Sequence, residues 1–334
     1  MTAKILIVTA ILFICAAAVE VGVRIMGVAP SIDDAHDKFL SDPHLPWRVK
    51  PDWSMTHPIQ DGASFTYTYN SRGFRDEEHS LEKPAGVYRI VALGDSFTHG
   101  TGADYEETYL VKLERALNEL TGGKPKVEII KMGVSGYWTA PERLMLEHYG
   151  LAYSPDLVIV GFLQNDIIDT QTAIHKKKVE KGYIVSQEGG LGDLGMWFYL
   201  NSEAMRILLS KYAEWKKSRT GYLDWEVAWR QILEELGKVV ELGNSAPAPA
   251  ITVVFHISQK TWAASGMEDH QLRLDNFCRE NGCVFIDSVD ELRKQPYPKD
   301  LYWQINGHCT PAGYAVMANA LLQVIIEHNL VPGL

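Results

Sequence analysis

The sequence predicts an α/β fold: a doubly wound, three-layer α/β/α domain built on a five-stranded parallel sheet. Short apolar runs rich in Val and Ile alternate with longer segments of helical periodicity. This alternation is typical of a parallel sheet that helices cover on both faces. The five expected strands are Val87–Leu93, Lys126–Lys131, Asp156–Phe162, Ala250–His256 and Cys283–Asp287.

Helical stretches separate and follow these strands. They are Glu106–Glu119, Ala140–Tyr149, a long region within Ser202–Leu242, Glu268–Glu280 and Ala312–His328. Five strands joined in this way fit the flavodoxin-like order 2-1-3-4-5, in which ligands bind at the carboxyl ends of the central strands. We expect residues 87–334 to form this domain.

The composition excludes several classes of function. Of 334 residues, 46% are hydrophobic and 22% are charged, as in a globular protein with a substantial core. The net charge of −10 argues against a nucleic-acid binder. The sequence has no Walker loop, GxGxxG motif or paired-histidine set, so we expect no metal and no cofactor. Cys278 and Cys283 are close enough in sequence to pair in an oxidising compartment, which the sequence leaves open.

The first 27 residues contain an apolar segment. An uncharged run, residues 5–19, is followed by Glu20 and by three more uncharged residues before Arg24. A spanning helix needs about 20 residues, so residues 5–23 are just long enough to cross a membrane. A signal peptide cleaved near Ala16–Ala18, an uncleaved anchor and a soluble core helix all remain open. We favour a membrane anchor with the body on the extracytoplasmic (periplasmic or extracellular) side; secretion after cleavage is the alternative.

Residues 28–86 are expected to form an extension packed on the main domain. They are rich in Pro, Asp, His and Trp and show little helical periodicity. Ser64–Tyr69 alternates hydroxyl and aromatic residues, which predicts a half-buried strand. Asn70–Arg75 then predicts a turn.

A second irregular segment, about residues 171–244, is too long for a simple crossover between strands. Gly182–Gly195 is glycine-rich and predicts a loop, whereas the part that follows predicts an inserted helical subdomain or lid. Its aromatic residues favour core packing over a carbohydrate platform. They are Trp215, Tyr222, Trp225 and Trp229.

Gly94-Asp95-Ser96 directly follows the first expected strand and precedes a helical segment. A hydroxyl at the carboxyl end of a buried strand, beside a helix amino terminus, is where α/β folds place reactive groups. All three residue types also favour turns, so the tripeptide alone predicts either a turn or a site.

Three further positions follow the carboxyl ends of other strands. Gly133 comes after the second strand, Asn165-Asp166 after the third, and His308 just before the last helix. Glycine lets a backbone N–H approach a ligand closely, and asparagine can donate from its amide. Singly, each is explained by a turn, a helix cap or a buried histidine. Together they supply a nucleophile, oxyanion donors and a base at one sheet edge.

With these residues in this order, the sequence resembles the SGNH/GDSL hydrolase family, whose defining residues are Ser, Gly, Asn and His. The matching blocks are Gly94-Asp95-Ser96, Gly133, Gly161-x-x-x-Asn165-Asp166 and His308. The third block has two residues more than the usual Gly-x-Asn-Asp. The resemblance spans about residue 70 to the carboxyl terminus, and Asn70-x-x-Gly73-Phe74-Arg75 is typical of exported, membrane-anchored members.

The resemblance implies a serine-esterase mechanism. Ser96 would attack an ester carbonyl while His308 takes its proton. The Ser96 N–H, the Gly133 N–H and the Asn165 side chain would form the oxyanion hole. Gly94, Asp95 and Asp166 would support these residues, and His99 is expected to be a loop residue.

One position departs from the family. Members carry an aspartate three residues before the histidine, or two before it in the alginate O-acetylation proteins, and these positions are Ile305 and Asn306 here. Three interpretations remain open. His308 is oriented by Asn306 or a backbone carbonyl, an acid from elsewhere such as Asp300 replaces the aspartate, or the enzyme is weakened, as an engineered Asp→Asn change would make it.

The leading hypothesis is a serine esterase that acts on O-acyl groups, including acetyl groups on cell-surface glycans or small esters. A catalytically weakened, membrane-tethered glycan-binding or scaffold protein is the first alternative. The second is an O-acyltransferase that uses the same residues with an alcohol acceptor in place of water. The substrate is not specified by the sequence.

Overall fold

In the computed structural model, five parallel strands form the sheet that the sequence predicts. They are β5 (Val87–Gly94), β6 (Lys126–Gly133), β7 (Leu157–Leu163), β10 (Ile251–Ile257) and β11 (Val284–Asp287). Their spatial order, β11-β10-β7-β5-β6, is the predicted 2-1-3-4-5 order. The structure describes residues 2–29, 38–60, 62–171, 177–180, 183–186, 192–219, 224–245, 250–257 and 267–334.

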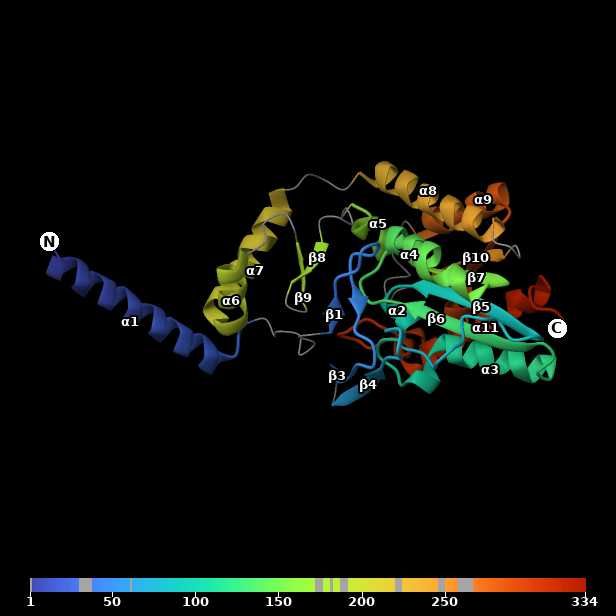
Figure 1. Ribbon diagram of the computed structural model, residues 1–334, viewed down its shortest axis with the longest axis horizontal. Coiled ribbons are helices and arrows are strands. Elements are labelled where there is room, and N and C mark those ends of the chain that lie inside the picture. Colours follow the sequence, from blue (N-terminus) through green and yellow to red (C-terminus); the bar gives the residue numbers. More distant parts are fainter. Residues whose placement is uncertain are drawn as a thin grey trace.

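Helices cover both faces of the sheet (Figure 1). One face is covered by α3 (Tyr109–Thr121) and α11 (Pro311–Glu327), and the other by α4 (Thr139–Met145), α8 (Trp225–Asn244) and α9 (Met267–Asn281). Alternate residues of each strand enter the two cores, as strand geometry requires. In β5, for example, Ile90 and Ala92 pack with α3 and α11, whereas Val91 and Leu93 pack on the opposite face.

Short elements complete the body. They are the single turns Tyr105–Glu107, Leu146–Gly150, Leu151–Tyr153 and Pro298–Leu301, and the helices α2 (Ser96–His99), α5 (Asn165–Asp169) and α10 (Val289–Arg293). Cys278 and Cys283 are joined by a disulfide, which resolves the pairing that the sequence left open.

The extension before β5 packs on the body. It contains the pair β1 (Phe39–Leu40) and β2 (Arg48–Val49), and the antiparallel hairpin β3 (Ser54–Gln60) and β4 (Ala63–Thr68). The turn predicted at Asn70 is formed: its side-chain oxygen accepts from the N–H groups of Arg72 and Phe74, both at 3.0 Å. Gly73 has φ 80°, and a Cβ there would lie 2.2 Å from the carbonyl oxygen of Val49.

Two side chains of the extension reach the carboxyl-terminal edge of the sheet. Arg75 donates to the carbonyl oxygens of the loop after α2, at His99 (3.1 Å), Gly100 (2.6 Å) and Ala103 (2.8 Å). Asp76 accepts from the backbone N–H and the ammonium of Lys131 on β6. The extension therefore supplies buried polar partners to the main domain.

The inserted segment is shorter than the sequence predicts. It contains the hairpin β8 (Lys177–Glu180) and β9 (Tyr183–Ser186), then α6 (Gly192–Asn201) and α7 (Glu203–Arg219). Helix α8 belongs to the body instead, because Trp229 and Leu236 are buried in the core on the sheet. The expected boundary near residue 244 is corrected to a position before α8.

The four aromatic residues of this region have different environments. Trp229 is in the core, as expected, but Trp215 and Trp225 are 50% and 44% exposed. Tyr222 and most of the predicted glycine-rich loop lie outside the described residues. Core packing therefore holds for Trp229 and is wrong for Trp215 and Trp225.

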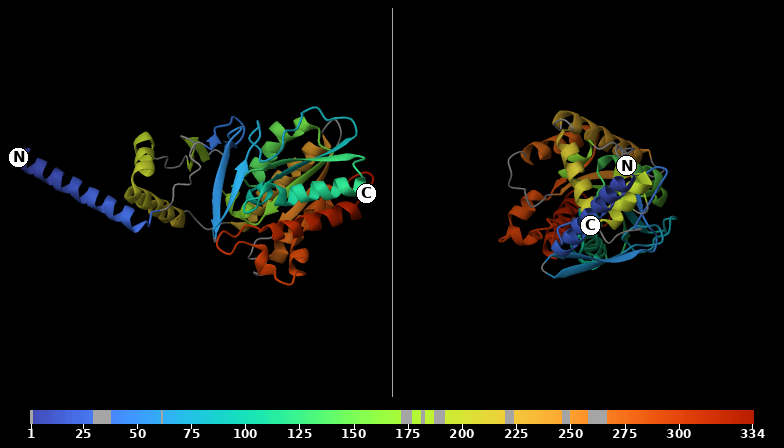
Figure 2. Two further views of the ribbon diagram at one scale, coloured as in Figure 1. Left: turned by 90° about the horizontal axis from the view of Figure 1, so that it is seen from below. Right: turned by 90° about the vertical axis from the view of Figure 1, so that its left-hand side faces the viewer.

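The amino-terminal segment forms one continuous helix, α1 (Thr2–Met26), that projects from the body (Figures 1 and 2). Residues Lys4–Met26 are long and apolar enough to cross a membrane, judged by length and composition. The large apolar side chains from Ile5 to Val21 are exposed, whereas Val23 is buried.

Candidate active site

The nucleophile candidate stands where β5 ends and α2 begins. Asp95 is the N-cap of α2 and accepts a 2.9 Å hydrogen bond from the N–H of Phe97. Ser96 is the first residue of the helix. A Cβ on Gly94 would lie 2.0 Å from the hydroxyl oxygen of Thr98, so only glycine lets the helix turn back so tightly on the strand. Gly94 and Asp95 thus have structural roles, which together set Ser96 at the start of α2.

Gly133 supports the same turn from the neighbouring strand. A Cβ on Gly133 would lie 2.4 Å from the backbone nitrogen of His99, so the backbones of β6 and α2 are in direct contact. Val134 donates to the carbonyl of Gly94, whereas the N–H of Lys131 bonds Asp76 on the other side. Because alternate N–H groups of a parallel strand point to opposite neighbours, the Gly133 N–H points away from β5. This geometry corrects the expected role: Gly133 packs against α2 and is not placed as an oxyanion donor.

His308 meets Ser96 across the crevice. Its Nε2 lies 2.8 Å from Ser96 Oγ, although the two residues are far apart in the sequence. The loop that carries His308 is closed by a hydrogen bond from the Trp303 N–H to the His308 carbonyl (2.8 Å). The Trp303 indole N–H also donates to the carbonyl of Gly102 at 2.8 Å, which ties this loop to the one after α2.

Asn306 contacts the other nitrogen of the imidazole. Its side-chain oxygen lies 2.5 Å from His308 Nδ1. With the amide oxygen as acceptor, Nδ1 carries the proton and Nε2 is free to accept the Ser96 proton. The backbone carbonyl of Asp300 accepts from the Thr310 hydroxyl at 3.0 Å. Of the three orienting groups that the sequence left open, the structure places Asn306 at Nδ1.

The electrostatics keep His308 neutral. Burial, followed by the nearby His57, lowers the pKa of His308 from 6.5 to about 4. A neutral imidazole is the form that can accept a proton at neutral pH. Asn306 brings no negative charge, so it orients the ring without the charge stabilisation that an aspartate would give to the imidazolium.

Asn165, the first residue of α5, lies beside the nucleophile turn. Its amide nitrogen is 3.5 Å from a carboxyl oxygen of Asp95 and 3.3 Å from one of Asp169. The amide therefore stands next to the residue that precedes Ser96. The role of Asn165 as an oxyanion donor stays a prediction.

Three buried carboxyl groups lie behind the site. Burial raises the pKa of Asp95 to about 7. Burial and the repulsion of neighbouring carboxylates raise the pKa values of Glu142 and Asp166 well above their usual range. Thr139 donates to Asp166 at 3.1 Å. Asp95 and Asp166, which the sequence predicts as supporting residues, are two of these buried groups. The third, Glu142, gave no signal in the sequence, because it occupies an ordinary position of a short helix.

His99, close to Ser96 in sequence, is engaged elsewhere. It is buried, and its ring nitrogens lie 2.7 Å from the Tyr69 hydroxyl and 3.2 Å from the Thr101 hydroxyl. Burial and the positive charge of Arg75 hold its pKa well below the usual value. His99 is therefore a structural residue of the loop, as predicted.

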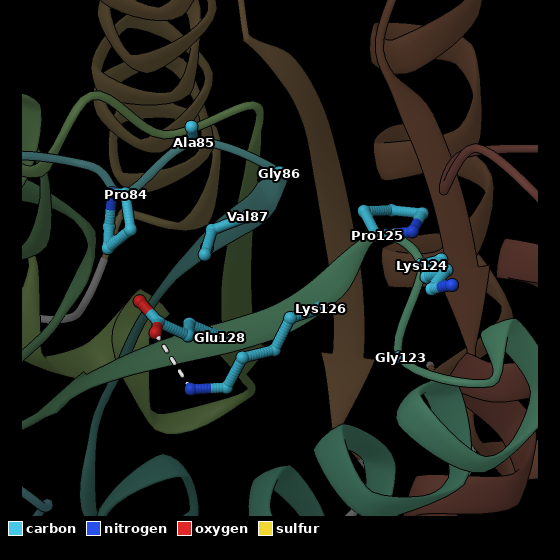
Figure 3. Close-up of a pocket in the computed structure, with 9 residues that line it drawn as sticks. All are labelled: Pro84, Ala85, Gly86, Val87, Gly123, Lys124, Pro125, Lys126 and Glu128. Atoms are coloured by element: carbon cyan, nitrogen blue, oxygen red, sulfur yellow. Dashed lines mark hydrogen bonds and ion pairs between the residues drawn. The ribbon is translucent and has the colours of Figure 1, made fainter.

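A pocket of about 700 Å³ lies at the opposite end of the sheet, where β5 and β6 begin (Figure 3). It is lined by residues 84–87 and 123–126 and by Glu128, and Lys126 and Glu128 pair at 3.1 Å. It contains none of the predicted site residues. Within the described part of the chain, no group of three or more His, Cys, Asp or Glu side chains is arranged to hold a metal ion.

Residues 92–316 match the profile of the GDSL-like lipase/acylhydrolase family, and this match covers more than half of the chain. The chain belongs to this family. It is therefore a carboxylic-ester hydrolase of the GDSL type, and the resemblance noted in the sequence is confirmed. No match was found among curated proteins.

Several solved structures are similar to this GDSL esterase. A lipolytic protein of the G-D-S-L family from Veillonella parvula DSM 2008 is 15% identical with a TM-score of 0.44, over 72% of this chain and 98% of that chain. An acetylxylan esterase from Geobacillus stearothermophilus is 15% identical with a TM-score of 0.46, over 71% and 94%. A two-domain esterase active on acetylated mannans is 13% identical with a TM-score of 0.46, over 74% and 51%.

Proposed function

We propose that this esterase hydrolyses O-acyl esters through a Ser96–His308 dyad that Asn306 orients. The Ser96 proton passes to His308 Nε2 as Oγ attacks the ester carbonyl carbon. The tetrahedral intermediate collapses, and the alcohol leaves with the proton from His308. Water then attacks the acyl-Ser96 ester, giving its proton to His308, and the carboxylic acid is released as Ser96 regains its proton.

The 2.8 Å contact between Ser96 Oγ and His308 Nε2 carries this proposal. In this contact the nucleophile is within hydrogen-bonding distance of the base. The nitrogen that faces Ser96 is Nε2, which is unprotonated in the tautomer that the reaction needs. The pKa of about 4 adds that His308 is unprotonated and ready to act at neutral pH.

For the oxyanion hole we propose the Ser96 N–H, the Asn165 amide and the N–H of Gly136. Gly136 lies in the loop just beyond β6, is exposed and has φ 82°, so its backbone is accessible where Gly133 is not. Loss of one such donor typically lowers kcat by about 10²–10³-fold. Asn165→Ala is therefore expected to be nearly as harmful as the loss of an auxiliary catalytic group.

The proposed location is the outer face of a membrane, with α1 as an uncleaved anchor. The exposed apolar surface of α1 supports the anchor. The disulfide between Cys278 and Cys283 supports an oxidising, extracytoplasmic compartment, since such bonds are rare in the cytosol. From this location we propose acylated carbohydrates of the cell surface, including acetylated ones, as the substrate class.

Hydrolysis of p-nitrophenyl acetate by the full chain in detergent tests the reaction. We expect turnover that Ser96→Ala abolishes and that His308→Ala lowers at least as strongly as Asn165→Ala does. Labelling of Ser96 by a fluorophosphonate, dependent on His308, is the second readout. Absence of both labelling and turnover contradicts the proposal and favours the weakened, glycan-binding alternative, which the neutral Asn306 motivates.

Acyl transfer to a sugar uses the same residues with an alcohol in place of water. The same assay with an added oligosaccharide separates the two reactions. Acylated sugar forming at the expense of free acid supports a transferase, whereas free acid as the sole product supports the hydrolase.

A further inference from the structure

The last turns of α1 are joined to the junction between α6 and α7. Glu20 accepts hydrogen bonds from the Ser202 hydroxyl (2.8 Å), from the Glu203 N–H (3.0 Å) and from the next N–H along the chain (3.1 Å). Arg24, paired with Glu20, donates to the carbonyl of Asn201 at 2.9 Å. A carboxylate at a helix amino terminus satisfies its free N–H groups and favours its dipole. The acid that interrupts the apolar run of α1 therefore holds the start of α7.

Both helices of this α6–α7 hairpin expose large apolar side chains at helical spacing. In α6 they are Leu194, Trp197 and Phe198, which are 70%, 53% and 36% exposed. In α7 they are Leu208, Tyr212 and Trp215, which are 58%, 57% and 50% exposed. The positions i, i+3, i+4 and i, i+4, i+7 place each set on one helix face. Large apolar side chains gathered on exposed helix faces mark an interaction site.

The hairpin lies at the depth where α1 would leave a membrane. Lys4–Met26 has 23 residues, which makes a helix of about 34 Å, close to the ~30 Å hydrocarbon thickness of a bilayer. Glu20 and Arg24 then stand near its outer surface, together with the α6–α7 junction that they bind. Figure 1 shows α7 running across the direction of α1, as a helix in the plane of the bilayer would.

We propose that the α6–α7 hairpin lies in the headgroup region of the bilayer that α1 spans, and that Glu20 fixes it there. This inference rests on the anchoring proposed above. Trp and Tyr favour this interfacial depth, where the ring is apolar and its polar atom is hydrated. The occupant is an anionic lipid surface, because α7 contains four basic residues besides the buried Arg206, and two acidic ones, in a chain of net charge −10.

The hairpin also sets which way the enzyme faces. Helix α2, with Ser96, lies at the end of the sheet nearer to α6 and α7 (Figure 1). A hairpin held at the lipid surface therefore keeps the catalytic edge turned toward the membrane. Acyl esters carried close to the bilayer are the substrates that this orientation favours.

The test compares two matched leucines in the full chain with Cys15→Ser, reconstituted in phosphatidylcholine/phosphatidylglycerol 3:1 vesicles. Leu194→Cys in α6 and Leu272→Cys in α9 are each labelled with an NBD fluorophore; Leu272 is 58% exposed and lies on the body. We expect the label at position 194, but not at 272, to emit at shorter wavelength and to be quenched by brominated acyl chains.

The outcomes separate the proposals. Co-flotation with vesicles and equal, water-like emission at both positions overturns the hairpin inference and leaves the anchor standing. A chain that does not float with the vesicles overturns both. A blue-shifted label at 194 that bromolipid does not quench, and that reverts as the protein is diluted in lipid, shows a second copy on the hairpin and overturns the inference. Ser96-dependent p-nitrophenyl acetate hydrolysis in the same samples reports on the esterase proposal independently.

Glu20→Ala tests the fixing contact. The variant keeps α1 apolar but removes the acceptor of the three hydrogen bonds from Ser202, Glu203 and Ala204 at the start of α7. We expect the label at position 194 to move toward water-like emission while flotation is unchanged. Unchanged emission in this variant overturns the role assigned to Glu20.

Discussion

The two sides of the catalytic crevice are built differently. On the nucleophile side, Ser96 follows a strand whose last glycine touches α2, and Gly133 touches the same helix from β6. On the base side, His308 lies at the end of a loop in which Ile305 is 85% exposed. Polar contacts hold that loop, among them the Trp303 indole N–H that donates to the Gly102 carbonyl and the Asn306 oxygen that accepts from His308 Nδ1.

The difference teaches where each side can change. A Cβ added to either glycine would lie below van der Waals distance from α2, so there is no room for another side chain and the nucleophile is fixed by shape. The base is fixed by polar atoms, which one substitution can replace without disturbing the fold. We expect changes on the first side to damage the enzyme and changes on the second side to tune it.

Gly133→Ala should break the nucleophile side and have the largest effect. The added methyl group meets the backbone of His99 at 2.4 Å, so α2 must move. We expect a loss of about 3 kcal/mol of stability and about 10² in kcat from misplacement of Ser96. Gly237→Ala in α8, with open space around its Cβ, is the control and should stabilise slightly. Equal behaviour of the two variants in denaturant unfolding and ester turnover would contradict the shape argument.

Asn306→Asp, on the base side, should raise kcat. A carboxylate at His308 Nδ1 stabilises the imidazolium, and the reverse change costs a serine protease ~10⁴ in kcat. We expect kcat to rise by about 10-fold or more if the ring stays in place. The acid limb of kcat/KM, expected near pH 4 for the unchanged enzyme, should move to higher pH because the carboxylate raises the His308 pKa. Asn306→Ala should lower kcat. If the acid limb of the kcat/KM profile stays at the same pH in Asn306→Asp, Asn306 does not orient His308.

The buried carboxyl groups predict a pH dependence of stability. The folded-state pKa values of Asp95, Glu142 and Asp166 are raised above their unfolded values. Their contribution to the free energy of unfolding is therefore fully present below the unfolded pKa of about 4. It is lost as pH rises toward 7 and above. His308, with its folded pKa lowered to about 4, acts in the opposite sense between pH 4 and 6.5.

Glu142→Gln isolates the carboxyl contribution. Removal of this one ionisable group should reduce the decrease in Tm between pH 5 and pH 8. The contribution of His308 to the pH dependence of stability should stay the same. Calorimetric scans across this range, with Glu147→Gln on the exposed part of the same segment as control, measure the effect. An identical Tm slope in the variant and the parent would refute the assignment.

Trp303→Phe should have the smallest effect. It removes the indole N–H that binds the Gly102 carbonyl but keeps an aromatic ring beside Phe65. We expect a loss of about 1 kcal/mol of stability and a decrease in kcat well below that of Gly133→Ala. Trp225→Phe, at a 44% exposed position, is the control. A decrease as large as that of Gly133→Ala would mean that the base side is as rigid as the nucleophile side.

The sequence was sufficient for the sheet, the strand order and the residues that meet in the crevice. Continuous Val- and Ile-rich runs identify buried parallel strands, and residues after such strands converge because parallel strands end at the same edge. Ser96 and His308, which lie 2.8 Å apart, were found in this way. The role of Gly133 was not, because the direction of an N–H group depends on pairing register, which composition does not reveal.

Other features depend on contacts that no local pattern encodes. Helix α8 looked like part of an insertion because its charged face and its buried Trp229 are mixed in sequence. Glu20 looked like an interruption of an apolar run because its partners are about 180 residues away. Both needed the tertiary structure, since each is explained by a distant segment and not by its neighbours.

Arg75 lies before the segment that matches the family, and this affects which part of the chain can fold by itself. The family match begins at residue 92, yet three carbonyls of the loop behind Ser96 depend on a guanidinium that lies before it. A chain excised at the family boundary would leave those acceptors buried without a donor. The smallest part of this enzyme that can be expected to fold and act therefore begins well upstream of the segment by which it is classified.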